Sequence, residues 1–131
     1  MKRTLALFIL CIFLSGGCAS LEDLTGVGPS TTYSSPTELY NRALSFYQRG
    51  QYDRARDLFH EYVGQYQGTP LYRIALYYLA HCYQMTGDKP EALTLFSRVV
   101  AQYGEDDFWG EQALERIRQI KDEDASFKKE Q

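Results

Sequence analysis

The sequence predicts an all-α fold, a short solenoid of two helix–turn–helix repeats followed by a C-terminal capping helix. Three observations support this prediction. Five helical stretches are separated by glycines, and four of them begin with helix-start signals. The sequence resembles itself at an offset of 37 residues, the distance from Leu39 to Leu76. Only four prolines occur in the chain, so long helices can form without interruption.

The N-terminal residues predict export and are set aside from the fold. Lys2 and Arg3 precede an apolar run from Leu5 to Leu14, which has the length of a signal-peptide core and is too short to cross a bilayer. We therefore expect residues 1–17 to be a signal peptide. Residues 18–35 are rich in Ser, Thr and Gly, and we expect them to form a flexible tether.

The end of the apolar run is similar to the lipobox of bacterial lipoproteins, because small residues, Ser15 to Gly17, precede Cys18. It departs from that pattern in having Ser15 where Leu is usual, with Leu14 one place earlier. The resemblance implies lipidation of Cys18, and Ala19 after it implies sorting to the outer membrane, facing the periplasm. The alternative is an ordinary signal peptide cut near Ala19, which would leave a soluble periplasmic or secreted protein.

The folded part begins with a capping box, in which Ser35 is the N-cap, Pro36 the first helical residue and Glu38 the third. Further caps are expected at Thr69, at Asp88 and at Asp106 or Asp107. The expected helices span 36–49, 51–66, 70–86, 89–103 and 107–121. Residues 122–131 carry both signs of charge and are expected to form a solvated tail.

The internal repeat defines the units within the expected domain, residues 36–121. The repeats are residues 36–69 and 70–106, and the capping helix is 107–121. Each repeat has a small residue, an aromatic three positions later, a glycine at the turn, then an alanine and a second aromatic. In order, these residues are Ala43, Phe46, Gly50, Ala55 and Phe59 in the first repeat, and Ala80, Tyr83, Gly87, Ala92 and Phe96 in the second.

This arrangement resembles the tetratricopeptide repeat (TPR). The longer spacing is similar to TPR lipoproteins of outer-membrane assembly and to the TPR domain of the Tol–Pal-associated periplasmic protein. The chain is shorter than the former, and it lacks the coiled coil expected of the latter. The resemblance implies that a partner protein or peptide binds along the groove of the first helix of each repeat. Carried over to this sequence, the groove positions are Tyr40, Leu44, Tyr47, Ile74, Tyr77, His81, Gln84, Leu114 and Arg118.

The alternative interpretation of these groove positions is packing between helices. A second aromatic set is expected near helix ends and outer faces, where it would form a dimer seam or dock onto envelope proteins. Its members are Tyr62, Tyr66, Tyr72, Tyr78, Tyr103, Phe108 and Trp109.

The sequence contains no motif for catalysis, phosphate binding or zinc, and we predict neither an enzyme, nor a metal site, nor a cofactor. The net charge is −3, and the sequence lacks the cluster of basic residues that is typical of a nucleic-acid-binding protein. Cys82 lies in an apolar helical stretch and is expected to pack in the core. The predicted function is a lipid-anchored envelope scaffold or assembly factor that binds an envelope protein or peptide. The alternatives are a structural homo-oligomer and an accessory subunit of a peptidoglycan enzyme complex.

Overall fold

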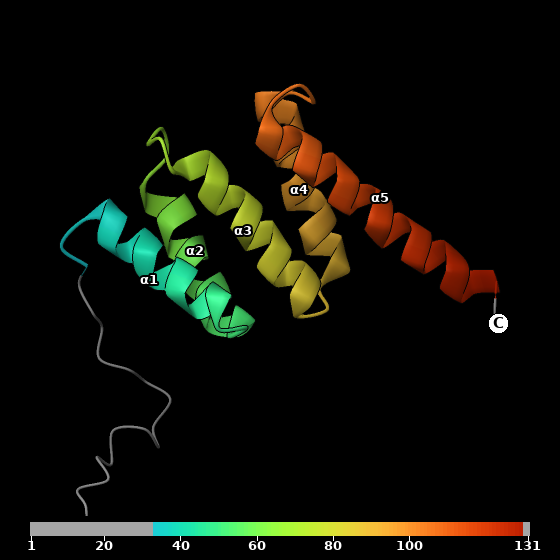
Figure 1. Cartoon of the computed structure of the whole chain (residues 1–131), viewed down its shortest axis with the longest axis horizontal. Helices are drawn as coiled ribbons and strands as arrows, with labels where there is room; N and C mark the ends of the chain where they lie inside the picture. Colours follow the sequence, from blue (N-terminus) through green and yellow to red (C-terminus); the bar gives the residue numbers. More distant parts are fainter. Residues whose placement is uncertain (1–32, 130–131) are drawn as a thin grey trace, which may run out of the picture. The chain divides into compact units, whose positions relative to one another are not determined.

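The computed structural model describes residues 33–129, which form five α-helices and no strand. These are α1 (Pro36–Gln48), α2 (Tyr52–Gln65), α3 (Tyr72–Met85), α4 (Lys89–Tyr103) and α5 (Phe108–Lys129). Each helix packs against the next one along the chain, and α3, in the middle, also touches α5 (Figure 1). The prediction of an all-α solenoid of helix pairs is therefore confirmed. None of these helices is long and apolar enough to span a membrane.

The expected signal peptide, Cys18 and the part of the tether before Tyr33 lie outside the described residues. They stay predictions from sequence.

Two of the expected helix caps form as the sequence indicates. The Glu38 backbone N–H donates to the Ser35 hydroxyl at 3.1 Å, and the Glu91 N–H donates to the Asp88 carboxylate at 3.3 Å. The Glu38 carboxylate accepts from the Ser34 backbone N–H at 2.9 Å, one residue earlier than in a capping box. Both helices carry a proline in their first turn, where its missing N–H costs nothing.

The expected cap at Thr69 is wrong. The third helix begins at Tyr72, not at residue 70, and its N-cap position is Leu71, which makes no side-chain bond. The Thr69 hydroxyl is already engaged, because it donates to the Tyr66 carbonyl and shares a hydrogen bond with the Tyr62 hydroxyl, both at 2.9 Å. Thr69 therefore closes the end of α2 instead of opening α3.

The expected end of the last helix at residue 121 is also wrong. α5 continues to Lys129, so most of the expected charged tail is helical. No glycine or proline interrupts residues 121–129, and Lys128 and Lys129 in the last turn suit the negative end of the helix dipole. Lys89 at the start of α4 also pairs with Glu123 and Asp124, at 3.1 and 2.8 Å, which holds the extension against the neighbouring helix.

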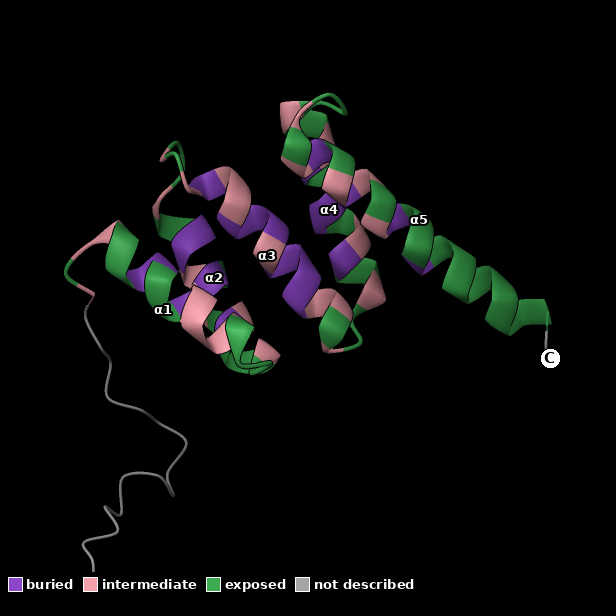
Figure 2. Cartoon of the chain, in the orientation of Figure 1, coloured by how far each residue is buried: buried purple, intermediate pink, exposed green. Residues whose placement is uncertain are grey.

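The core follows the repeat. The alanines at the helix-pair contacts, together with Phe59 and Phe96, are fully buried. These alanines are Ala43, Ala55, Ala80 and Ala92. Small residues let the helix axes approach, and the aromatic rings fill the space beside them. Figure 2 shows the longest run of buried residues on α3, the third of the five helices.

Two features fix where α5 begins. The Asp107 carboxylate accepts from the Trp109 backbone N–H at 3.0 Å and also pairs with Arg73 of α3 at 2.7 Å. Asp107, rather than Asp106, is therefore the cap. Gly110 is buried against the turn after α4, and a Cβ atom at Gly110 would lie 1.8 Å from the Gly104 carbonyl oxygen. α5 consequently approaches the end of α4 as closely as backbone atoms allow.

Candidate partner-binding surface

The residues expected to line the groove divide into buried and accessible ones. Tyr40, Tyr77 and His81 are only 7, 6 and 7% exposed, so they belong to the core. The Tyr40 ring packs edge-on against Phe59 and Tyr62, with centroids 5.8 Å apart in each case. Interhelical packing is thus the correct interpretation for these three. The half-buried members are Leu44, Tyr47, Ile74, Gln84 and Leu114, and Arg118 is exposed.

Tyr47, a half-buried residue of α1, contacts two other helices. Its hydroxyl lies 2.9 Å from Nδ1 of His81, which links α1 to α3. Its ring meets the edges of Tyr52 at 5.5 Å and Tyr78 at 4.7 Å. Tyr47 therefore sits where α1, α2 and α3 come together.

Beyond Tyr47 the rings form a continuous series, which we call the aromatic row. It consists of Tyr52, Tyr47, Tyr78, Trp109 and Phe108. Tyr78 lies 5.9 Å from Trp109, and Trp109 lies 5.1 Å from Phe108. The first four residues are half-buried and Phe108 is 61% exposed. The aromatic row thus joins α1, α2, α3 and α5 with rings that keep part of their surface accessible.

The sequence predicts Tyr78 and Trp109 on a separate outer surface, but the ring contacts place Tyr78 beside Tyr47 and Trp109 beside Tyr78. A signal for Tyr78 was present, because it lies four residues after Ile74 and three before His81, on the same helix face. Trp109 had no comparable signal, because α5 does not continue the repeat pattern.

On α5 the structure favours a different arginine from the one expected. Arg116 is half-buried, and its Nε donates to the Tyr77 hydroxyl at 3.4 Å. Arg118 is exposed and pairs with Glu115 of its own helix, at 3.9 Å. Tyr77 itself packs between Phe96 and Trp109, with centroids at 5.5 and 5.1 Å. Arg116 therefore carries the positive charge that lies beside the aromatic row.

The ionisable groups buried around Tyr47 are held in their neutral forms. Burial, and to a lesser extent the charge of Arg116, lowers the pKa of His81 to about 4. Burial raises the pKa of the Tyr47 hydroxyl well above its ordinary range, and it raises the pKa of the Cys82 thiol to about 12. Buried in these neutral forms, the His81 ring and the Cys82 thiol help to pack the helices and do not form a reactive nucleophile or base. Among residues 33–129, no three metal-ligating side chains gather in one place.

The sequence profile of the tetratricopeptide repeat matches residues 40–107, just over half of the chain. The chain belongs to the tetratricopeptide repeat family. TPR proteins generally mediate protein–protein interactions and are typically not enzymes. The match extends from α1 through α4 and stops at Asp107, so the capping helix α5 lies outside it. A comparison with curated proteins gives no match for the chain.

Proposed function

We propose that this TPR protein binds a segment of a partner protein across the aromatic row. The observation that carries the proposal is the unbroken series of partly accessible rings from Tyr52 to Phe108, contributed by both repeats and the capping helix. A single helix can be aromatic for reasons of packing alone. Rings that remain partly accessible on α1, α2, α3 and α5 provide a surface longer than any one core contact needs.

The chemistry of the row suits an extended or helical peptide. Tyr and Trp rings supply a large contact area at a low entropic cost, and the tyrosine hydroxyls add hydrogen bonds. The Tyr47 hydroxyl is held by His81 and the Tyr77 hydroxyl by Arg116, so the surface is organised before a partner arrives. Such a site recognises apolar side chains flanked by hydrogen-bonding groups.

We further propose that the protein works as a lipid-anchored envelope scaffold or assembly factor. The support is the sequence of residues 1–18, in which a basic start, an apolar run and small residues precede Cys18. Acyl chains on Cys18 would hold the TPR domain at the outer membrane. The partner would then be another envelope protein.

Site-specific photo-crosslinking tests the partner surface. p-Benzoylphenylalanine replaces Phe108, at the end of the aromatic row, because this side chain is 61% exposed and its replacement disturbs no core contact. We expect crosslinks from this position to one defined partner segment, identified by mass spectrometry of the crosslinked peptides. Because the partner is expected to bind the aromatic row, the variant Tyr78→Ser should lower the crosslinking yield.

Phe127 provides a matched control, because it is also a phenylalanine of α5 and is 63% exposed, but it lies in the extension beyond the row. Crosslinks that form only from Phe127, or with equal yield from both positions, would refute binding at the row.

A structural homo-oligomer is the second candidate. The large exposed rings of Phe108 and Phe127 on one helix favour it, because exposed aromatics often mark interfaces. The same experiment separates the two, since a homo-oligomer gives crosslinks between copies of this chain.

A further inference from the structure

Three arginines surround one phenylalanine at the turn between α1 and α2. The guanidinium carbons of Arg42, Arg49 and Arg54 lie 5.1, 4.9 and 5.7 Å from the centre of the Phe46 ring. All three arginines are exposed. Each is within the range of a cation–π contact, so one ring gathers three positive charges. We call Arg42, Arg49 and Arg54 the arginine cluster.

The equivalent ring of the second repeat shows how many arginines are needed to cover an aromatic side chain at this position. Phe46 corresponds to Tyr83 at the repeat offset, and Tyr83 is covered by a single guanidinium, that of Arg56, at 5.6 Å. Arg56 is neutralised by Asp53 and Asp57, at 3.2 and 3.3 Å. One paired arginine is therefore enough to cover the ring.

The arginine cluster has no such neutralisation. Among residues 33–129, no carboxylate oxygen lies within 4.0 Å of its guanidinium nitrogens. Glu38, the acidic residue one turn before Arg42, accepts hydrogen bonds from Ser34 instead. Holding three like charges around one ring is unfavourable, so coverage of Phe46 does not explain the cluster.

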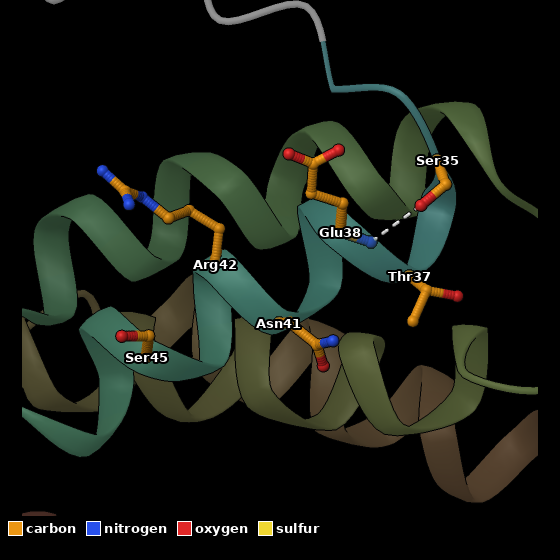
Figure 3. A pocket seen from close by; sticks show the side chains of 6 residues that line it. All are labelled: Ser35, Thr37, Glu38, Asn41, Arg42 and Ser45. Carbon is orange, nitrogen blue, oxygen red and sulfur yellow. Dashed lines mark hydrogen bonds between the residues drawn. The ribbon is translucent and has the colours of Figure 1, made fainter.

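A polar hollow along the outer face of α1 leads to the arginine cluster. Figure 3 shows its lining, which comes from α1 and its N-cap and includes Arg42 itself. The other lining residues are Ser35, Thr37, Glu38, Asn41 and Ser45. The hollow is lined by hydroxyl, amide and charged groups without an apolar side chain, so it suits a polar chain rather than a hydrophobic one.

We propose that the arginine cluster is a second docking site, which binds an acidic segment of a partner protein. Guanidinium groups form paired hydrogen bonds with carboxylates, and their stacking on Phe46 holds them in place before binding. The chain as a whole carries a net charge of −3. The net negative charge of the chain repels a broad anionic surface. A short acidic segment contacts only the arginine cluster and avoids most of this repulsion. This site is separate from the aromatic row and does not depend on the function proposed there.

The test is fluorescence anisotropy of a labelled polyglutamate peptide with the full chain at low ionic strength. We expect Arg42→Gln, Arg49→Gln and Arg54→Gln together to weaken binding about tenfold, since each exposed charge pair contributes modestly. Arg54→Gln alone, which leaves α1 unchanged, should weaken it about twofold. Binding by the wild-type chain should decline as salt is added.

The control triple variant is Arg118→Gln, Lys121→Gln and Lys128→Gln. It removes the same charge from exposed positions of α5, and we expect less than about a twofold change from it. Circular dichroism verifies that both variants are folded. Equal losses in the two triple variants, or wild-type affinity in the cluster variant, would overturn the proposal. It would also be overturned if vesicles of anionic lipid bound through the cluster while polyglutamate did not.

Discussion

His81 shows how one side chain can be both polar and structural. It lies in the core between α1 and α3, where Tyr47 contacts Nδ1, and both Tyr52 and Arg116 face it. A protonated ring would place a charge in the core beside an arginine. Burial and, to a lesser extent, the charge of Arg116 therefore favour the neutral form.

This arrangement predicts acid sensitivity with a defined sign. The folded pKa of His81 is lowered from 6.5 to about 4, so in that range the unfolded chain binds a proton that the folded chain excludes. The stabilising effect is complete above pH 6.5 and is lost as the pH falls toward 4. Thermal or urea unfolding should show a loss of about 2 kcal/mol across this window.

The matching variants separate His81 from other acid effects. His81→Gln should flatten the pH dependence over this range, because it removes the titrating ring. His60→Gln, on the exposed face of α2, serves as the control. An unchanged slope in His81→Gln would show that carboxylates alone cause the acid sensitivity.

At this scale the sequence predicted residue types better than residue roles. The alanines, glycines and aromatics of the repeat were recognisable because close helix packing needs those shapes. Tyr40, Tyr77 and His81 were expected in the groove and are buried, because sequence spacing gives a helix face but not the depth of the neighbouring helix. Arg116 differs from Arg118 by only two positions, and the contact with Tyr77 distinguishes them.

Between elements, the most restrictive contact is that of Gly110 with the turn after α4. Helix propensity alone would make alanine the better residue at this position. There is no room for an alanine side chain at Gly110, because its Cβ atom would lie 1.8 Å from the Gly104 carbonyl oxygen. Gly110→Ala is therefore expected to lower the free energy of unfolding by about 3 kcal/mol, as α5 is pushed from α4. Chemical denaturation followed by circular dichroism measures this change in the free energy of unfolding.

Gly64 is the matched control, because it is also a helical glycine but has no atom within 4 Å of its added Cβ. Gly64→Ala should raise the free energy of unfolding by about 0.5 kcal/mol. A neutral Gly110→Ala variant would mean that α5 does not sit as closely on α4 as described.

Helix positions were predictable from sequence wherever a local signal decided them. Ser35 and Asp88 cap their helices as expected, since the cap bonds to the N–H three residues later. Thr69 failed as a cap because its hydroxyl is used by Tyr62 and Tyr66, which a local pattern does not reveal. The extension of α5 pairs with Lys89, which lies far away in sequence, so this contact has no local signal.

For the whole molecule, the proposed anchor gives a direct prediction. If Cys18 is acylated, the native protein should be recovered with the membrane and have the mass of a lipid-bearing chain that begins at Cys18. Cys18→Ser should lose both properties, because the acyl chains provide the membrane affinity. Fractionation and intact-mass measurement test this together.

Cys82→Ala is the control for that experiment. Its thiol is buried with a pKa raised to about 12, so it should not affect membrane association. Retention of Cys18→Ser in the membrane, or an unmodified native mass, would contradict lipidation. The TPR fold would be unaffected by either result.

The overall architecture was predictable because a repeat specifies the same contacts twice. The offset of 37 residues placed two helix pairs, and the structure has both. The aromatic row was only partly predictable, since it joins Tyr47 of α1 to Trp109 of α5 across α3. Contacts between unlike elements have no sequence period, so they emerge only from the packed structure.

The order of packing has a consequence for how the domain forms. Each helix contacts mainly the helix beside it in sequence, so most contacts close short loops. Chains dominated by such local contacts fold rapidly, in milliseconds or less, without waiting for distant segments to meet. A helix pair such as α3 and α4 can therefore form early and serve as the template on which the helices at either end assemble.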